Sequence, residues 1–141
     1  MTIKAVKAII LVNKNYLLQL RDRKKNISFP NHWGLFGGRI GKKEKNIIAL
    51  KREIKEETNL NVKTIRRVFN VDFDIIGLKK KRNLQYYECE IIGKKKIKLS
   101  EGKKYKFFSF QQIKKLNIVP MDFVALKSHY LHINHFISIY R

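Results

Sequence analysis

The sequence predicts a mixed α/β domain, in which helices cover both faces of a mixed β-sheet. Segments rich in β-branched and aromatic residues recur along the chain, and such segments favour strands. Two longer segments, one central and one C-terminal, have the apolar spacing of helices. The chain has 141 residues, of which 44% are hydrophobic. This length and composition predict one domain over residues 1–141 with a core of its own.

The N-terminal half begins with an expected β-hairpin. Residues 3–12 are apolar and β-branched, Asn13-Lys14-Asn15 is typical of a turn, and residues 16–20 continue the apolar pattern. Three further elements are expected before the centre of the chain: a polar loop at 21–30, a short strand at 33–40 that leads into a glycine turn, and a helix at 44–58.

The C-terminal half contributes strands first and a helix last. Pro120 is typical of a helix start. The expected elements, in order, are strands at 62–73 and 84–92 with a loop at 77–82 between them, a strand at 104–110, a helical turn at 111–116 and a helix at 121–137.

The charge of the chain is strongly positive, at +21 from Lys+Arg 32 and Asp+Glu 11. The 24 Lys outnumber the 8 Arg, whereas specific readout of phosphates and bases relies more on Arg. The lysines therefore favour a solvated surface that attracts phosphate-rich ligands, and a dedicated nucleic-acid site is the alternative. Clusters of lysine lie, among other places, at 79–81, 94–96, 103–104 and 114–115.

Composition excludes several classes of protein. No apolar stretch approaches the roughly 20 residues of a membrane span, and the N-terminal segment has no small-residue cleavage site of a secretory signal. Cys89 is the single cysteine, which excludes an internal disulfide framework and a multi-cysteine zinc site. We therefore expect a cytoplasmic protein that has no membrane partner.

Acidic residues are concentrated in one segment of this basic chain. Four of the 11 acids lie within fourteen positions, at Glu44, Glu53, Glu56 and Glu57. On the expected helix the last three are related by i+3 and i+4, so their side chains leave from one sector of the helix. An apolar stripe with the same spacing lies beside them, at Ile47, Leu50 and Ile54. The carboxylates are therefore expected at the edge of the buried face.

The spacing of these carboxylates favours a bound cation over ordinary surface ion pairs. Two carboxylates about 6 Å apart repel by roughly 3 kcal/mol at an effective dielectric near 20. Glu53 and Glu57 have no basic residue at i±3 or i±4, and only Glu56 has one, at Arg52. Mg²⁺ prefers a few carboxylates together with substrate phosphates. The preceding Gly37-Gly38 pair allows the backbone to approach a ligand closely.

These residues resemble the Nudix box, which reads Gly, five residues, Glu, seven residues, Arg-Glu-aliphatic-any-Glu-Glu-any-Gly-aliphatic. The chain has Gly38, five residues, Glu44, seven residues, and then Arg52-Glu53-Ile54-Lys55-Glu56-Glu57-Thr58-Asn59-Leu60. One fixed position differs, because Asn59 stands where the box has glycine. Asn is the best non-glycine residue for a left-handed backbone, so Asn59 is expected to end the helix in that conformation.

The resemblance covers nearly the whole chain and implies a Nudix-type α/β/α sandwich with a mixed β-sheet. Nudix proteins mostly hydrolyse nucleoside diphosphates linked to another group, with Mg²⁺ or Mn²⁺. The implied site comprises metal ligands Glu56 and Glu57, a further ligand or base at Glu53, a backbone carbonyl of Gly37 or Gly38, and Arg52 as the charge-assisted partner of a carboxylate.

The resemblance leaves the general base open between Glu53 and a later acid. Glu101, which precedes a glycine and an aromatic strand, resembles the later acid that approaches the metals in the MutT-type subgroup. Asp122 follows a proline and resembles the acid with which MutT-like members read the base, while an ordinary acid in the first turn of a helix is the alternative. Arg21 and Arg23 are expected to contact phosphate because of their charge.

The function that these features imply is MutT-like hydrolysis of a (deoxy)nucleoside triphosphate to a monophosphate and pyrophosphate. A nucleotide-sugar diphosphatase is the alternative within the same class, and a basic module that binds RNA or processes RNA ends or caps is the alternative outside it. The expected partner is a small-molecule nucleotide, with nucleic acid as a further candidate because of the charge of +21. The sequence leaves the oligomeric state open, a homodimer included.

Overall fold

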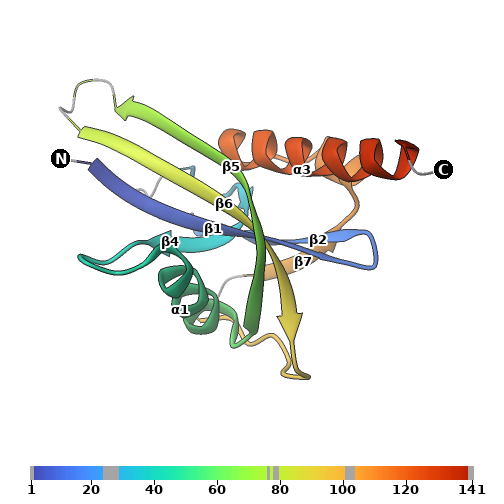
Figure 1. Cartoon of the computed structure of the whole chain (residues 1–141), viewed down its shortest axis with the longest axis horizontal. Helices are drawn as coiled ribbons and strands as arrows, with labels where there is room; N and C mark the ends of the chain where they lie inside the picture. The colour runs from blue at the N-terminus through green and yellow to red at the C-terminus, as the bar shows by residue number, and fades with distance from the viewer. Residues whose placement is uncertain (1, 24–28, 76, 78–79, 101–103, 140–141) are drawn as a thin grey trace.

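The computed structural model (Figure 1) describes residues 2–23, 29–75, 77, 80–100 and 104–139. Four strands precede the first helix, three strands follow it, and two helices come last. In chain order the elements are β1 (Thr2–Val12), β2 (Asn15–Leu20), β3 (Trp33–Gly34), β4 (Phe36–Arg39), α1 (Asn46–Thr58), β5 (Asn61–Ile75), β6 (Lys80–Ile92), β7 (Lys104–Phe108), α2 (Phe110–Ile113) and α3 (Pro120–Ile139).

The strand β1 organises the sheet because it pairs with three other strands. It runs parallel to β6, from the Thr2–Lys81 pair to the Ile10–Cys89 pair, and β6 in turn pairs antiparallel with β5. Residues 5–8 of β1 pair antiparallel with β4, and the end of β1 forms a hairpin with β2. β2 also pairs with β3 and β7. Within the described part of the chain, the sheet is therefore mixed and has seven strands.

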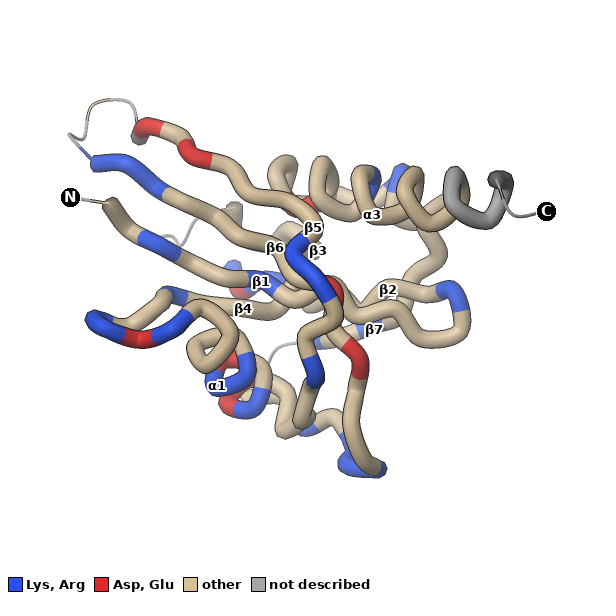
Figure 2. Tube along the Cα trace, viewed as in Figure 1, with Lys and Arg blue, Asp and Glu red and all other residues tan. Residues whose placement is uncertain are grey.

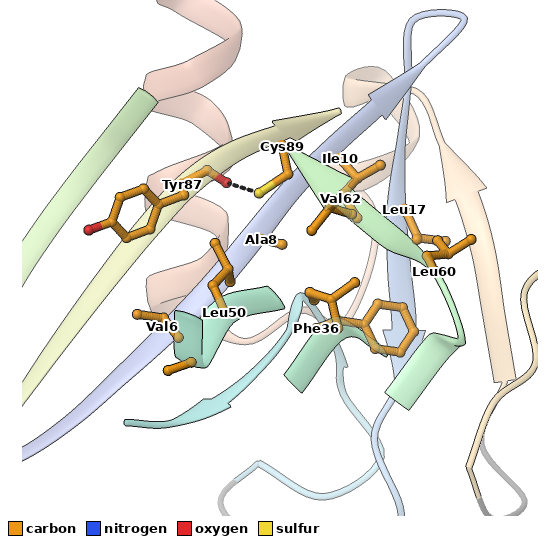
Figure 3. Packing of buried hydrophobic residues seen from close by; sticks show 12 residues of the cluster. Val6, Ala8, Ile10, Leu17, Phe36, Leu50, Leu60, Val62, Tyr87 and Cys89 are labelled. Atoms are coloured by element: carbon orange, nitrogen blue, oxygen red, sulfur yellow. Dashed lines mark hydrogen bonds between the residues drawn. The ribbon is translucent and has the colours of Figure 1, made fainter. Parts of the chain in front are cut away.

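Helices cover both faces of this sheet, with α1 on one side and α3 on the other (Figure 1). Successive side chains of a strand point to opposite faces, so β1 contributes to two separate buried clusters. Val6, Ala8 and Ile10 pack with α1 in one cluster (Figure 3). Ile9 belongs to the other cluster, which includes Leu126 of α3. The expected arrangement of a mixed sheet between helices is confirmed.

The single cysteine lies inside the cluster on the α1 side. Cys89 is buried, and its thiol donates a hydrogen bond to the carbonyl oxygen of Tyr87 at 3.6 Å (Figure 3). Burial raises the pKa of this thiol to about 12. Cys89 therefore packs as a small apolar side chain of the core.

The turn and cap residues of the N-terminal half behave as the sequence predicts. Asn13 and Lys14 both have positive φ, at 49° and 67°, as a two-residue hairpin turn requires. α1 begins at Asn46, slightly later than the expected residue 44, and Asn59 follows its last residue with a left-handed backbone at φ 67°. The N–H of Asn59 donates to the carbonyl oxygen of Lys55 at 2.9 Å. The helix-ending role of Asn59 in place of glycine is confirmed.

The expectation of one strand at 33–40 is wrong, because the structure divides this segment into β3 and β4. β3 pairs with β2, whereas β4 pairs with β1. Leu35 lies between them and donates its N–H to Asp122 Oδ2 at 2.9 Å. A contact between residues far apart in the sequence therefore accompanies the break in the strand. Strand propensity, which depends on neighbouring residues, does not predict such a contact.

The hairpin of β5 and β6 is longer than expected, and it shortens the loop expected at 77–82. Asn83 donates from Nδ2 to Asn70 Oδ1 at 2.8 Å and to Asp72 Oδ1 at 2.7 Å, across the two strands. Asn and Asp are depleted in strands as single residues. Here the side chains of Asn70, Asp72 and Asn83 hydrogen-bond to one another across the two strands, so the strands continue through these residues.

The last helix begins at Pro120, as its helix-start signal predicts. α3 has 20 residues and is the longest helix of the described chain. None of the helices in the described ranges is both long and apolar enough to cross a membrane.

Replacement of a buried residue of α1 tests the packing of this helix on the sheet. Ile54 is 0% exposed and Ile48, on the same helix, is 55% exposed. We expect Ile54→Ala to lower the free energy of unfolding by about 2–5 kcal/mol, because it leaves a cavity in the core. Ile48→Ala is the matched control and should change it by about 0.5 kcal/mol or less. Urea unfolding measures both, and equal losses would contradict the assignment of the buried face.

Candidate active site

The helix α1 carries its acidic side chains along the rim of its buried face. Glu53 keeps 18% of its side chain exposed, and Glu56, one turn later, keeps 58% exposed. The residues that pack against the sheet are Ala49, Leu50, Ile54 and Thr58. The spacing of acidic and apolar positions therefore produces the partly buried carboxylate edge that the sequence predicts.

Arg52 connects the acids of this edge through its guanidinium group. Its Nε donates to Glu44 Oε2 at 2.8 Å and its Nη2 donates to Glu44 Oε1 at 2.9 Å, a two-point contact. Its Nη1 donates to Glu53 Oε1 at 2.9 Å and, at 3.4 Å, to Glu56 Oε2. Paired hydrogen bonds from a planar guanidinium fix the orientation of a carboxylate. Arg52 thus orients the acids of the helix and of the loop before it.

Glu44 belongs to the loop between β4 and α1, where it is held from two sides. Besides Arg52, the backbone N–H of Gly41 donates to Glu44 Oε1 at 2.8 Å. The hydrogen bonds from Arg52, and next the one from Gly41, lower the pKa of Glu44 from 4.5 to about 2. Glu44 is therefore ionised at neutral pH, and its contacts join the loop to Arg52 in the middle of α1.

The two glycines before the helix lie against two of its carboxylates. The N–H of Gly37 donates to Glu57 Oε1 at 3.2 Å. A Cβ atom at Gly38 would overlap the carboxylate of Glu53, and a Cβ atom at Gly37 would collide with the backbone of β1 at Val6. Glycine at both positions thus makes room for the acids on one side and for the neighbouring strand on the other.

The donor set of this edge suits a hard divalent cation, because it offers carboxylate and backbone carbonyl oxygens. In the described residues, no three His, Cys, Asp or Glu side chains converge closely enough to hold a metal ion. Glu53 turns instead to Arg52, and Glu57 turns to Gly37. The carboxylate of Glu53 lies against the backbone at Gly38, in the space that a Cβ atom would fill. These oxygen-bearing residues therefore fit a divalent cation, both in their chemistry and in their positions along α1.

The other residues singled out from the sequence belong to segments of the chain outside α1. Asp122 is fully buried in the first turn of α3. Arg21 and Asp122 both lie against Gly34. A Cβ atom added at Gly34 would lie 3.0 Å from Asp122 Oδ2 and 3.6 Å from Arg21 Cδ. Arg23 is exposed. Glu101 lies outside the described residues.

Two residues that the sequence analysis did not single out bind the Asp122 carboxylate. Lys7 Nζ donates to Asp122 Oδ1 at 2.8 Å and to Oδ2 at 2.9 Å, and Tyr86 Oη donates to Oδ1 at 2.7 Å. Burial, and then the charge of Asp122, raises the pKa of Tyr86. A signal for Lys7 existed in the sequence, since it is a charged residue inside an apolar strand. Its partner could not be named, because Asp122 is 115 positions away.

Comparisons with known proteins agree with this geometry. The chain matches the NUDIX domain family model over residues 1–127. The structure of a MutT protein from Methanosarcina mazei Go1 is similar, with a TM-score of 0.75, 22% identity and coverage of 95% of both chains. The structure of a UDP-X diphosphatase has a TM-score of 0.76 and 18% identity, covering 96% of this chain and 64% of that one. E. coli dihydroneopterin triphosphate pyrophosphohydrolase gives a TM-score of 0.67 and 18% identity, covering 88% and 92%.

The family match covers most of the chain, so the protein belongs to the Nudix family and is a Nudix hydrolase. The structural similarities, all at low identity, establish the shared fold. Among curated proteins, none matches the sequence.

The Glu44–Arg52 contact predicts a pH-dependent contribution to stability. Because the pKa of Glu44 is lowered from 4.5 to about 2 by folding, this contribution is present above about pH 4.5 and is lost as the pH falls toward 2. We expect Glu44→Gln to unfold more easily than the wild type near pH 7, and the difference to shrink below about pH 4.5.

Urea unfolding of both proteins between neutral and acid pH measures this difference. Glu90→Gln, which removes an exposed acid of β6, controls for the loss of one negative charge. A difference between wild type and Glu44→Gln that stays constant with pH would contradict the assignment.

Proposed function

We propose that the protein hydrolyses the phosphoric anhydride of a nucleoside triphosphate, in a metal-dependent reaction that yields a monophosphate and pyrophosphate. The observation that carries the proposal is the carboxylate edge of α1. Arg52 holds Glu53 beside Gly38, and Gly37 holds Glu57, so two acids of the Nudix box lie along one edge of α1. The family match supports the reaction class, and the substrate is our inference.

The metal site proposed here uses the exposed end of this edge. Nudix hydrolases generally use Mg²⁺ or Mn²⁺. Glu56 and Glu57 would hold the cation, with a backbone carbonyl of Gly37 or Gly38 as a further ligand, and Glu53 would be either another ligand or the base. When bound, the cation neutralises charge on the phosphate oxygens and activates the attacking water.

Glu53 is the proposed base within the described residues. Arg52 donates to Oε1 of Glu53, so Oε2 is the atom that takes the proton of the attacking water. Arg52 acts as a positioning residue, because a base must lie within hydrogen-bond reach of the proton it removes. Glu101, the later acid that precedes a glycine and an aromatic strand, is the alternative base.

The substrate is proposed to lie between the acidic edge and the start of α3. Asp122 belongs to the end that recognises the base, and Arg21 and Arg23 contribute positive charge for the phosphates. The similarity to a UDP-X diphosphatase supports nucleotide-sugar cleavage as the second candidate.

The remaining positive charge is proposed to be a solvated surface. Figure 2 shows Lys and Arg on strands, helices and loops throughout the chain rather than gathered on one element. Such a distribution raises the local concentration of phosphate-rich ligands in general. A cytoplasmic location is proposed from the single Cys89, which is free and buried.

Product release across a panel of substrates tests the proposed reaction. We expect nucleoside triphosphates to yield pyrophosphate with Mg²⁺ and nothing with chelator, while nucleotide sugars and capped RNA are poor substrates. Glu57→Gln should raise the Mg²⁺ concentration for half-maximal activity by at least about tenfold. Glu90→Gln, in an exposed acid of β6, is the matched control and should leave it unchanged. Turnover of nucleotide sugars or capped RNA alone would replace the proposed substrate.

The pH dependence of kcat distinguishes the two candidate bases. We expect Glu53→Gln to lower kcat by about 10²–10⁴-fold and to remove the acid limb of the pH profile, because that limb reports the ionisation of the base. Glu101→Gln should keep the acid limb. The reverse result, with the limb lost only in Glu101→Gln, would transfer the role of base to Glu101.

A further inference from the structure

The carboxylate of Asp122 has no capacity left to read a substrate by itself. It is 0% exposed. Its two oxygens accept four hydrogen bonds, two from Lys7 Nζ, one from Tyr86 Oη and one from the N–H of Leu35. A carboxylate offers about four lone-pair sites, so any group that binds Asp122 directly must first displace one of these donors.

The ammonium group of Lys7 has capacity to spare. It carries three N–H donors, and Asp122 takes two of them. Within the described residues, no acceptor for the third is found. The Lys7 side chain keeps 15% of its surface exposed, against 0% for Asp122. Lys7 is therefore the member of the pair that a ligand can reach, as a donor whose position Asp122 fixes.

The Lys7–Asp122 pair is connected to the proposed catalytic edge by one short segment of chain, residues 35–37. Lys7 pairs across the β1–β4 ladder with Gly37, and the N–H of Gly37 donates to Glu57 Oε1. Leu35, two residues earlier, donates to Asp122. The segment from Leu35 to Gly37 thus has the carboxylates of α1 on one side and the Lys7–Asp122 pair on the other.

We propose that Lys7 is a specificity-determining residue, which donates a hydrogen bond to a carbonyl oxygen of the base and therefore prefers a 6-oxopurine to adenine. Asp122 is its positioning residue. The inference rests on the proposed nucleotide substrate and assigns which purine this site prefers.

The chemistry of an ammonium group decides which base it favours. Lys donates hydrogen bonds and accepts none. Guanine presents O6 and N7 to it as adjacent acceptors, whereas adenine presents an amino donor in place of O6. A donor held at one place by a buried partner therefore favours the oxo base and disfavours the amino base. A phosphate oxygen would accept equally well, but it would give no preference between bases.

Binding of nucleoside monophosphates tests the proposal without requiring turnover. The probes are GMP, IMP and AMP, titrated against the wild-type protein by calorimetry. We expect GMP and IMP, which share O6, to bind at least about tenfold more tightly than AMP. Equal binding of the three nucleotides, or IMP binding as weakly as AMP, would overturn the proposal. This comparison stands even where a variant fails to fold.

Variants then locate the preference at Lys7. In Lys7→Met the preference for GMP over AMP should disappear, because the affinity for GMP falls to that for AMP. Lys4→Met, in an exposed lysine of the same strand, is the matched control and should keep the wild-type preference. Equal weakening of GMP and AMP in Lys7→Met would assign Lys7 to a phosphate or ribose contact and overturn the proposal, as would no change.

Asp122→Asn tests the positioning role. It should lower the preference between GMP and AMP, because Lys7 loses its fixed place, whereas a merely structural role would weaken both nucleotides alike.

The outcome is distinguishable from failure of the proposed hydrolysis. A wild-type protein that prefers GMP and IMP but cleaves no nucleoside triphosphate would refute the reaction and keep the role of Lys7. A protein that cleaves triphosphates with no preference between bases would refute the role of Lys7 and keep the reaction.

Discussion

The buried carboxylate of Asp122 joins parts of the molecule that the chain itself keeps far apart. Its donors come from β1, from β6 and from the residue between β3 and β4, while Asp122 itself belongs to α3. A buried ion is costly unless its hydrogen-bonding capacity is filled, and removal of one partner of such a pair costs about 3–5 kcal/mol. Four donors fill it here. The break at Leu35, the separate course of β4 and the docking of α3 all depend on this one group.

The break at Leu35 also fixes the opposite side of the sheet. Because β4 leaves β3 and follows β1, Gly37 and Gly38 reach the acidic edge of α1. There, Arg52 supplies one positive charge to Glu44, Glu53 and Glu56. The network remains negative inside a protein of charge +21. This local excess of negative charge is what a divalent cation would neutralise, and the surrounding lysines favour the approach of phosphate-rich substrates.

The features that sequence reasoning predicts are those set by neighbouring residues. The periodicity of α1, the turn at Asn13 and Lys14, and the left-handed cap at Asn59 depend on local spacing and backbone preference, and all three were predictable. The features that it misses depend on contacts between distant residues. In the sequence Leu35 has the character of a strand residue, but in the structure its N–H donates to Asp122 instead of to a neighbouring strand. The sequence does not reveal the partner of Lys7, which is one lysine among 24. Pairing across strands likewise decided how far β5 and β6 extend.

The burial of Cys89 has a practical consequence for spectroscopy. A thiol reacts as the thiolate, and this one has its pKa raised to about 12 inside the core. Because the chain has no other cysteine, we expect the natural protein to react only slowly with alkylating dyes. A single cysteine introduced at an exposed position away from the proposed site, such as Lys94 after β6, would carry the label alone, so a fluorescence or spin probe could be attached without repacking the core.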